Sequence, residues 1–131
     1  MRRYIFAAIS VLALGGVHAQ ESGTKITGDE LRALVTGANV THVSRYGSLR
    51  RWTNAPDGTF VASTSNQKHG GAMAHSSSGS GKWSINSDGK FCIEIDWKRE
   101  LENWCAFIIK GEDGAYYLGK VDPARKIEFT K

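Results

Sequence analysis

The sequence lacks most of the patterns that identify enzymes and membrane proteins. After residue 19, no stretch approaches the roughly 20 apolar residues of a membrane span. No serine lies in a nucleophile-elbow pattern, and no glycine-rich loop leads into a helix as in a phosphate-binding motif. The chain has only two cysteines, and they lack the Cys-x-x-Cys spacing of redox pairs and zinc sites. We therefore expect a protein that is not an enzyme and has no cofactor.

The N-terminal segment has the organisation of a secretory signal. A positively charged start, Met1–Arg3, precedes an apolar stretch over residues 4–17, and Val17-His18-Ala19 fits a signal-peptidase site. We expect residues 1–19 to be a signal peptide, with cleavage before Gln20. Residues 20–131 then form a single β-rich domain in the periplasm or outside the cell. A retained membrane anchor is disfavoured, because the apolar stretch is short for a span.

The charge balance gives little support to a nucleic-acid partner. The chain has 17 Lys and Arg against 13 Asp and Glu, and a sequence pI near 9.2. Once Arg2 and Arg3 leave with the signal, 15 basic residues remain, and the net charge falls to about +2. The basic residues are scattered, and only Arg45, Arg50 and Arg51 lie close together. We expect a monomer with no nucleic-acid partner and no membrane span.

Beyond the signal, the pattern changes from helical to alternating. Residues 20–26 resemble a flexible lead-in, Thr27 and Glu30 fit a capping box, and Gly37 fits the end of a helix of about ten residues. Short alternating stretches then follow, separated about every ten residues by turn sequences. The expected strands are residues 39–46, 48–54, 59–65, 82–86, 90–97, 104–110, 115–121 and 126–130. The fold class is mainly β: a seven- or eight-stranded antiparallel meander curled into a small barrel, with one short N-terminal helix.

The cysteines and the apolar residues favour the same strand register. Two cysteines in an exported chain predict one disulfide, Cys92–Cys105, which closes a loop of about 14 residues and stabilises by about 3 kcal/mol. If the two cysteines are opposite each other, alternation places a set of apolar residues on one face. This set comprises Phe91, Ile93, Ile95, Trp97, Trp104, Ala106 and Ile108.

The sequence resembles a family of small exported proteobacterial proteins of unknown function. The resemblance covers most of residues 20–131 and consists of a Thr-Gly-x-Glu-Leu helix, a Pro-Asp-Gly turn and a Gly-x-Trp…Asp-Gly-x-x-Cys…Trp…Cys pattern. The matching positions are Thr27, Gly28, Glu30, Leu31, Gly37, Val40, Pro56, Asp57, Gly58, Gly81, Trp83, Asp88, Gly89, Cys92, Trp97 and Cys105. Each element is structural, so the resemblance implies a secreted or periplasmic β-rich domain with one disulfide and no established activity.

The segment 66–80 stands apart in composition. It is rich in Gly and Ser and has too few apolar residues to hold a fixed conformation alone, so we expect a long mobile loop that is either functional or disordered. His69, Met73 and His75 could bind a soft cation such as copper, although a metal site usually needs further ligands. The two histidines could equally contact a ligand or a protein partner.

Two other groups are candidates for chemistry. Glu94 and Asp96 are two residues apart on one strand. Together with Glu102 or Asn103, they could form the carboxylate pair of a hydrolase. Carboxylates that face solvent are, however, common on antiparallel sheets. Arg50, Arg51 and Trp52 could line a barrel mouth and bind an anionic or aromatic ligand, although core packing is the commoner role of a tryptophan.

These observations favour a non-enzymatic binding or interaction module. Its ligand would bind in the barrel mouth, or an exported protein partner would bind the 66–80 loop. The alternatives are an inhibitor of an exported cell-wall-type hydrolase, a periplasmic metal binder and a carboxylate-based hydrolase.

Overall fold

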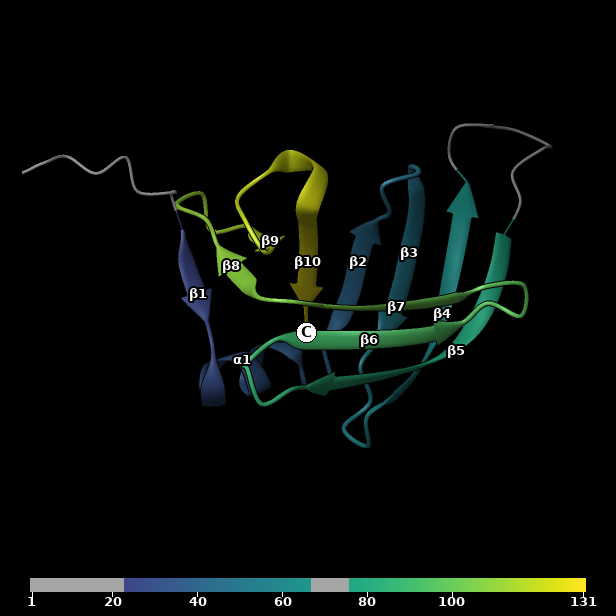
Figure 1. Cartoon of the computed structure of the whole chain (residues 1–131), viewed down its shortest axis with the longest axis horizontal. Helices are drawn as coiled ribbons and strands as arrows, with labels where there is room; N and C mark the ends of the chain where they lie inside the picture. The colour runs from purple at the N-terminus through teal and green to yellow at the C-terminus, as the bar shows by residue number, and fades with distance from the viewer. Residues whose placement is uncertain (1–22, 67–75) are drawn as a thin grey trace, which may run out of the picture.

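The computed structural model describes residues 23–66 and 76–131, in which one antiparallel sheet of ten strands is accompanied by a single α-helix (Figure 1). The sheet order is β1-β8-β9-β10-β2-β3-β4-β5-β6-β7. The expected mainly β class is confirmed, with ten strands instead of seven or eight. The elements are β1 (Thr24–Ile26), α1 (Gly28–Val35), β2 (Asn39–Val43), β3 (Ser48–Thr53), β4 (Thr59–Asn66), β5 (Ser76–Ile85), β6 (Phe91–Asp96), β7 (Leu101–Ala106), β8 (Ile108–Lys110), β9 (Tyr116–Leu118), the short 3-10 helix η2 (Pro123–Arg125) and β10 (Lys126–Thr130).

The sheet curls into a half-barrel. Figure 1 shows β6 and β7 running across the front of β10, β2 and β3. After Phe107 the chain continues from β7 into β8, which pairs with β9 and β1 at the other end of the sheet. One face of the curved sheet is therefore turned inward, between β6–β7 in front and the strands behind them.

Alternation along the strands fills this inner face with apolar side chains. Phe91, Ile93, Ile95 and Trp97 are buried, as the pattern of β6 predicts. The register of β6 and β7 also follows the prediction, because Cys92 pairs with Cys105 and the residues on either side pair accordingly. Helix α1 adds Leu31 and Val35, both fully buried, to the same core. The helix therefore closes one end of the half-barrel (Figure 1).

A fully buried asparagine fastens the helix to the sheet. The Asn54 side chain donates to the Val35 carbonyl at 2.9 Å and accepts from the Trp52 indole nitrogen at 2.8 Å. Its backbone amide donates to the Ala38 carbonyl, and its own carbonyl accepts from the Gly37 amide. Gly37 has φ +71, the left-handed conformation expected of a residue that ends a helix. One side chain thus satisfies polar groups from both α1 and β3.

The N-terminal part of the domain differs from the expectation in two ways. The lead-in contains a strand, β1, which pairs with β8 over three residues and is too short for alternation to reveal. Thr27 occupies the N-cap position, but its side chain makes no capping hydrogen bond. The next residue, Gly28, has φ +60, so the chain enters the helix through a left-handed residue. The capping-box prediction was therefore wrong in its hydrogen bond and right in its position.

The serine- and glycine-rich segment was also partly mispredicted. Residues 76–80 were expected to be loop, but they form the first half of β5 and pair with β4. Pairing with β4 along this whole stretch, and with β6 from Ser80 onward, stabilises a composition that would not hold a strand by itself. Gly81, also on β5, lies directly against the ring of Phe60, its partner on β4, in the space that a Cβ atom would occupy. Residues 67–75, which include His69, Met73 and His75, lie outside the described part of the chain.

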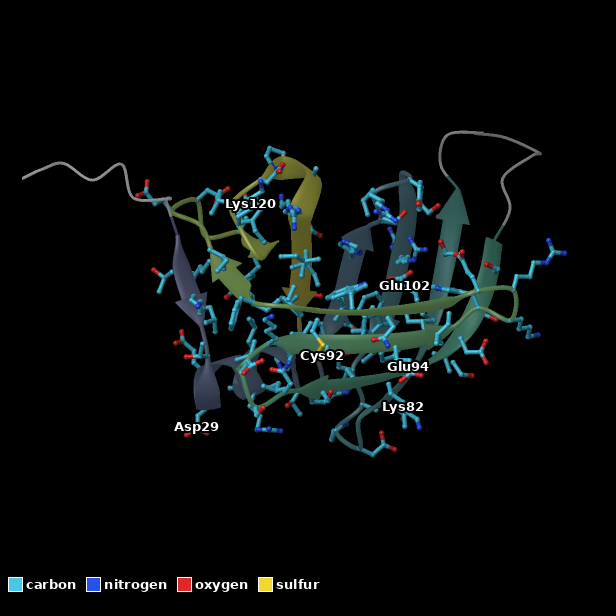
Figure 2. The ribbon with its side chains drawn as sticks, viewed as in Figure 1. Asp29, Lys82, Cys92, Glu94, Glu102 and Lys120 are labelled. Atoms are coloured by element: carbon cyan, nitrogen blue, oxygen red, sulfur yellow. A yellow bond between two sulfur atoms is a disulfide. The ribbon has the colours of Figure 1, made fainter. Side chains whose placement is uncertain are left out.

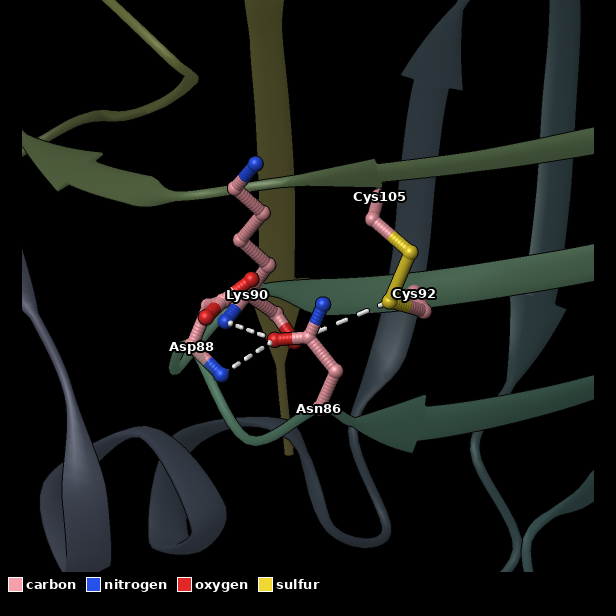
Figure 3. Close-up of a disulfide and its surroundings, with 5 residues drawn as sticks. All are labelled: Asn86, Asp88, Lys90, Cys92 and Cys105. Carbon is pink, nitrogen blue, oxygen red and sulfur yellow. Dashed lines mark hydrogen bonds between the residues drawn. A yellow bond between two sulfur atoms is a disulfide. The ribbon is translucent and has the colours of Figure 1, made fainter.

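The predicted disulfide joins the last two strands of the sheet. Cys92 and Cys105 are bonded, with their Cα atoms 4.0 Å apart, between β6 and β7 (Figure 2). Beside it, the turn from β5 to β6 is held by Asn86, whose side-chain oxygen accepts from the amides of Asp88 and Lys90 (Figure 3). The disulfide lies on the outer face, opposite the core, so it fixes the register without occupying the inner face.

Candidate ligand-binding site

Three neighbouring strands place a row of polar side chains on the inner face. His42 of β2 pairs with Arg50 of β3, and Arg50 pairs in turn with Thr64 of β4. These residues follow the same alternation as the core, because Val40 and Trp52, two positions away along β2 and β3, are buried. We call these three residues the inner polar row. The row lies on the same face as the apolar core, so its polar side chains are an exception on that face.

Arg50 is the most deeply buried charge in the described part of the chain. Its residue is only 8% exposed, and its Nε lies 2.6 Å from Oε1 of Glu102 on β7. Glu102 also accepts from the indole nitrogens of Trp97, at 3.3 Å to Oε1, and of Trp104, at 3.0 Å to Oε2. The Arg50 guanidinium lies over the Trp97 ring, 5.5 Å from its centroid. The contact with Arg50 connects Glu102 of β7, labelled in Figure 2, to β3 across the half-barrel.

Each member of the inner polar row has a buried polar atom with no hydrogen-bond partner among the described residues. These atoms are Nδ1 of His42, Nη1 of Arg50 and Oγ1 of Thr64. Arg50 Nε has the close ionic contact with Glu102, but not the geometry of a hydrogen bond. Most buried polar side-chain atoms in folded proteins have a partner, and three unpaired atoms on adjacent strands are a departure from that rule. The row therefore has hydrogen-bonding capacity that the described residues do not use.

The electrostatics of the row centre on His42. Burial lowers the pKa of its imidazole below 6.5, Glu102 opposes this effect by raising the pKa, and Arg50 adds a smaller lowering. The imidazole is consequently neutral at neutral pH, and its ring lies 5.7 Å from that of Trp104. A neutral imidazole can donate or accept at Nδ1, depending on its tautomer. The row thus combines a fixed donor, Arg50, with two groups that can do either.

Of the arginines and tryptophan predicted to line a mouth, only Arg50 lies in the inner polar row. Arg51 is exposed and points to the outer face, where it pairs with Thr41 and Ser63. Trp52 is buried and stacks on Phe60 with ring centroids 5.1 Å apart. Trp52 therefore belongs to the core, which was its commoner expected role.

The two candidate carboxylates lie on the outer face. Glu94 is exposed and pairs with Lys82 of β5 and Asn103 of β7 (Figure 2). Asp96 is also exposed, and its side chain accepts from the Lys98 amide at 2.8 Å, an ordinary turn contact. Glu102, which was one of two candidates to join this carboxylate pair, lies on the inner face instead. No cluster of three or more His, Cys, Asp or Glu that could hold a metal occurs within residues 23–66 and 76–131.

The sequence did contain a signal for two residues of this site that were missed. Trp104 was assigned to the inner face, and Glu102 is two residues earlier on the same strand, so alternation places it inward as well. His42 follows Val40 by two residues in the same way. Thr64 gave a weaker signal, because apolar residues occupy both faces of β4: Phe60 and Ala62 are buried on its own face, but Val61 lies on the other.

A protein-family model matches residues 6–107, most of the chain; its description is protein of unknown function, DUF995. The chain belongs to this family. No curated protein and no solved structure matches this DUF995 member. No helix in the described ranges has the length and apolar character that a membrane crossing requires.

Proposed function

We propose that this DUF995 protein is an exported, non-enzymatic module that binds a small polar ligand at the inner polar row, His42, Arg50 and Thr64. The observation that supports this proposal is the set of unpaired buried atoms on three adjacent strands. A ligand that bonds to them would remove a cost of about 1–3 kcal/mol for each group. Ligand binding therefore explains why these polar residues continue an otherwise apolar face.

The surroundings of Arg50 favour binding because they hold its side chain in one place. Glu102 contacts Arg50 at Nε, while the indole groups of Trp97 and Trp104 hold Glu102 from the other side. A side chain already ordered before binding loses little conformational entropy when the ligand arrives. Arg50 therefore provides a preorganised donor at Nη1.

Export is the second part of the proposal. The disulfide Cys92–Cys105 is typical of proteins that reach an oxidising compartment, and residues 1–19 have the pattern of a secretory signal. We expect the exported protein to begin at Gln20. Mass spectrometry of the protein recovered from the periplasm or medium checks this, and an intact N-terminus on the recovered protein would contradict it.

A pair of variants on β4 tests the binding site. Thr64→Val replaces an inward hydroxyl at nearly constant volume, and Ser63→Ala removes its outward neighbour as a matched control. Because the Thr64 hydroxyl has no partner within residues 23–66 and 76–131, Thr64→Val should raise the free energy of unfolding by about 1 kcal/mol. Ligand binding should nevertheless weaken, and Ser63→Ala should leave both quantities unchanged.

The measurement combines urea denaturation with a broad screen of small polar molecules, read by tryptophan fluorescence and thermal shift. Trp97 and Trp104 contact Glu102 and should report occupancy of the row. A compound that binds wild type and Ser63→Ala more tightly than Thr64→Val supports the proposal. Equal binding to all three proteins, or a loss of stability in Thr64→Val, would show that Thr64 has only a structural role.

A further inference from the structure

The charge of Arg50 is already compensated inside the half-barrel. Its partner Glu102 contributes the opposite charge at 2.6 Å. His42 adds no charge at neutral pH, because burial and the nearby Arg50 lower the pKa of its imidazole more than Glu102 raises it. The inner polar row and Glu102 together are therefore electrically neutral.

A free anion fits this arrangement poorly. It would introduce a second negative charge close to Glu102, whose two oxygens are already contacted by Arg50, Trp97 and Trp104. To pair with Arg50 it would have to share or displace Glu102, and either change leaves a buried charge incompletely compensated. An uncharged ligand needs no such rearrangement.

The free atoms of the row define the hydrogen-bonding groups of such a ligand. Arg50 Nη1 can only donate, so the ligand must present an oxygen or nitrogen acceptor there. His42 Nδ1 and Thr64 Oγ1 can each donate or accept, and a hydroxyl group complements either state. Neighbouring strands are roughly 4.8 Å apart, so the row offers three bonding positions at intervals comparable to the width of a sugar ring.

The aromatic neighbours suit the apolar part of the same ligand. Trp104, which is only partly buried, packs against His42, and Trp97 lies beneath the Arg50 guanidinium. Sugar rings combine an apolar C–H face with hydroxyl groups around the edge. Aromatic rings beside convergent polar groups are a common composition for small-molecule sites.

We infer that the ligand of the inner polar row is an uncharged polyhydroxy compound of the saccharide class, bound through hydroxyl groups to Arg50, His42 and Thr64. This inference rests on the proposed function, since it names the ligand of that site. It differs from the anionic ligand that an exposed arginine cluster would suggest.

Sugar pairs that differ in one charge test the inference. The full chain, purified after export, is titrated with glucose and glucuronate and with galactose and galacturonate, followed by tryptophan fluorescence and calorimetry. At least one neutral sugar should bind about tenfold or more tightly than its acid, because the acid places an unpaired charge near Glu102. Raising the ionic strength should change the affinity of the neutral sugar little.

Two variants localise the binding to the row. Arg50→Lys keeps a cation beside Glu102 but removes the guanidinium donor, and should weaken sugar binding by about tenfold. Arg51→Lys makes the same change on the outer face of the same strand and should have no effect. Equal effects of the two variants would mean that the sugar binds elsewhere, and would overturn the inference.

The remaining outcomes separate the inference from the proposed function. If the acids bind more tightly than the neutral sugars, and their affinity falls with added salt and in Arg50→Lys, the site binds an anionic ligand. The saccharide inference then fails, while the proposed function holds. If only neutral compounds other than sugars bind at the row, the inference fails in the same way. If no compound of the sugar panel or the broad screen responds to Thr64→Val or Arg50→Lys, both are overturned.

Discussion

Replacement of Asn54 by alanine should be among the most damaging single changes in the domain. The side chain is fully buried and links the end of α1 to β3 through Val35 and Trp52. In Asn54→Ala, the buried Trp52 indole N–H loses its partner, and the Val35 carbonyl keeps only the hydrogen bond from the Ala38 amide, at 3.2 Å. Water cannot easily replace the amide, because both neighbours are at most 4% exposed.

The size of the effect follows from one orphaned group and one lost hydrogen bond. The orphaned Trp52 N–H costs about 1–3 kcal/mol and the lost bond to the Val35 carbonyl about 0.5–1.5 kcal/mol, so the loss should be about 1.5–4.5 kcal/mol. Small domains are stable by about 5–15 kcal/mol, and the variant should therefore be partly unfolded at moderate urea concentrations. The matched control is Asn39→Ala: Asn39 is exposed and accepts from the Thr53 hydroxyl at 2.7 Å. The free energy of unfolding of Asn39→Ala should be within about 0.5 kcal/mol of wild type, as is usual for a substitution at the surface.

Urea denaturation followed by circular dichroism measures these differences, and a double-mutant cycle tests their cause. Trp52→Phe removes the indole N–H, so in that background Asn54→Ala removes only the hydrogen bond to the Val35 carbonyl. The second mutation should then cost about 1–3 kcal/mol less than in wild type. A cost below 1 kcal/mol for Asn54→Ala, or full additivity with Trp52→Phe, would refute the argument that these hydrogen bonds hold the helix to the sheet.

Three further predictions concern the disulfide, the packing of Gly81 against Phe60 and the pH dependence of stability. Replacing Cys92 and Cys105 by serine should lower the free energy of unfolding by about 3 kcal/mol; no change in the urea midpoint would contradict this. Gly81→Ala should cost about 1–3 kcal/mol or more, because the new methyl group overlaps the Phe60 ring, whereas the exposed control Ser80→Ala should be neutral in the same assay. As pH falls below 6.5, stability should decrease, because the unfolded state protonates His42 before the native state does, and His42→Asn should flatten that part of the stability–pH curve. An unchanged slope of this curve in His42→Asn would show that protonation of His42 does not contribute to the pH dependence of stability.

Local sequence rules predicted the elements whose partners are near in the chain. The β6–β7 register follows from Cys92 and Cys105 together with the alternation of Phe91, Ile93 and Ile95, and the structure has the same pairs. The first half of β5 could not be predicted in this way. Its serines and glycines have low strand propensity, and this half of the strand exists because β4 pairs with it along its whole length and β6 pairs with β5 from Ser80 onward.

The candidate site was harder to predict because it depends on the curl of the sheet. Arg50 was recognised as a binding residue, but alternation alone does not say which face of β3 is covered. Its partner Glu102 is on β7, at the far end of the sheet order, and reaches Arg50 only because β7 crosses in front of β3. Glu102 does not join Glu94 because alternation along β7 turns it inward, whereas the other expected companion, Asn103, pairs with Glu94 on the outer face.

The disulfide also determines what happens to the molecule when a protease cuts it. The turn between β6 and β7 presents Lys98 and Arg99, both exposed, and Lys98 has φ +73. A protease that cleaves after basic residues should cut here more readily than within the paired strands. Cys92 and Cys105 lie on opposite sides of that cut, so the two pieces would remain one covalent molecule with the β6–β7 pairing in place. The nick should be visible on a reducing gel and absent from a non-reducing one, and the inner polar row would keep its Glu102 after cleavage.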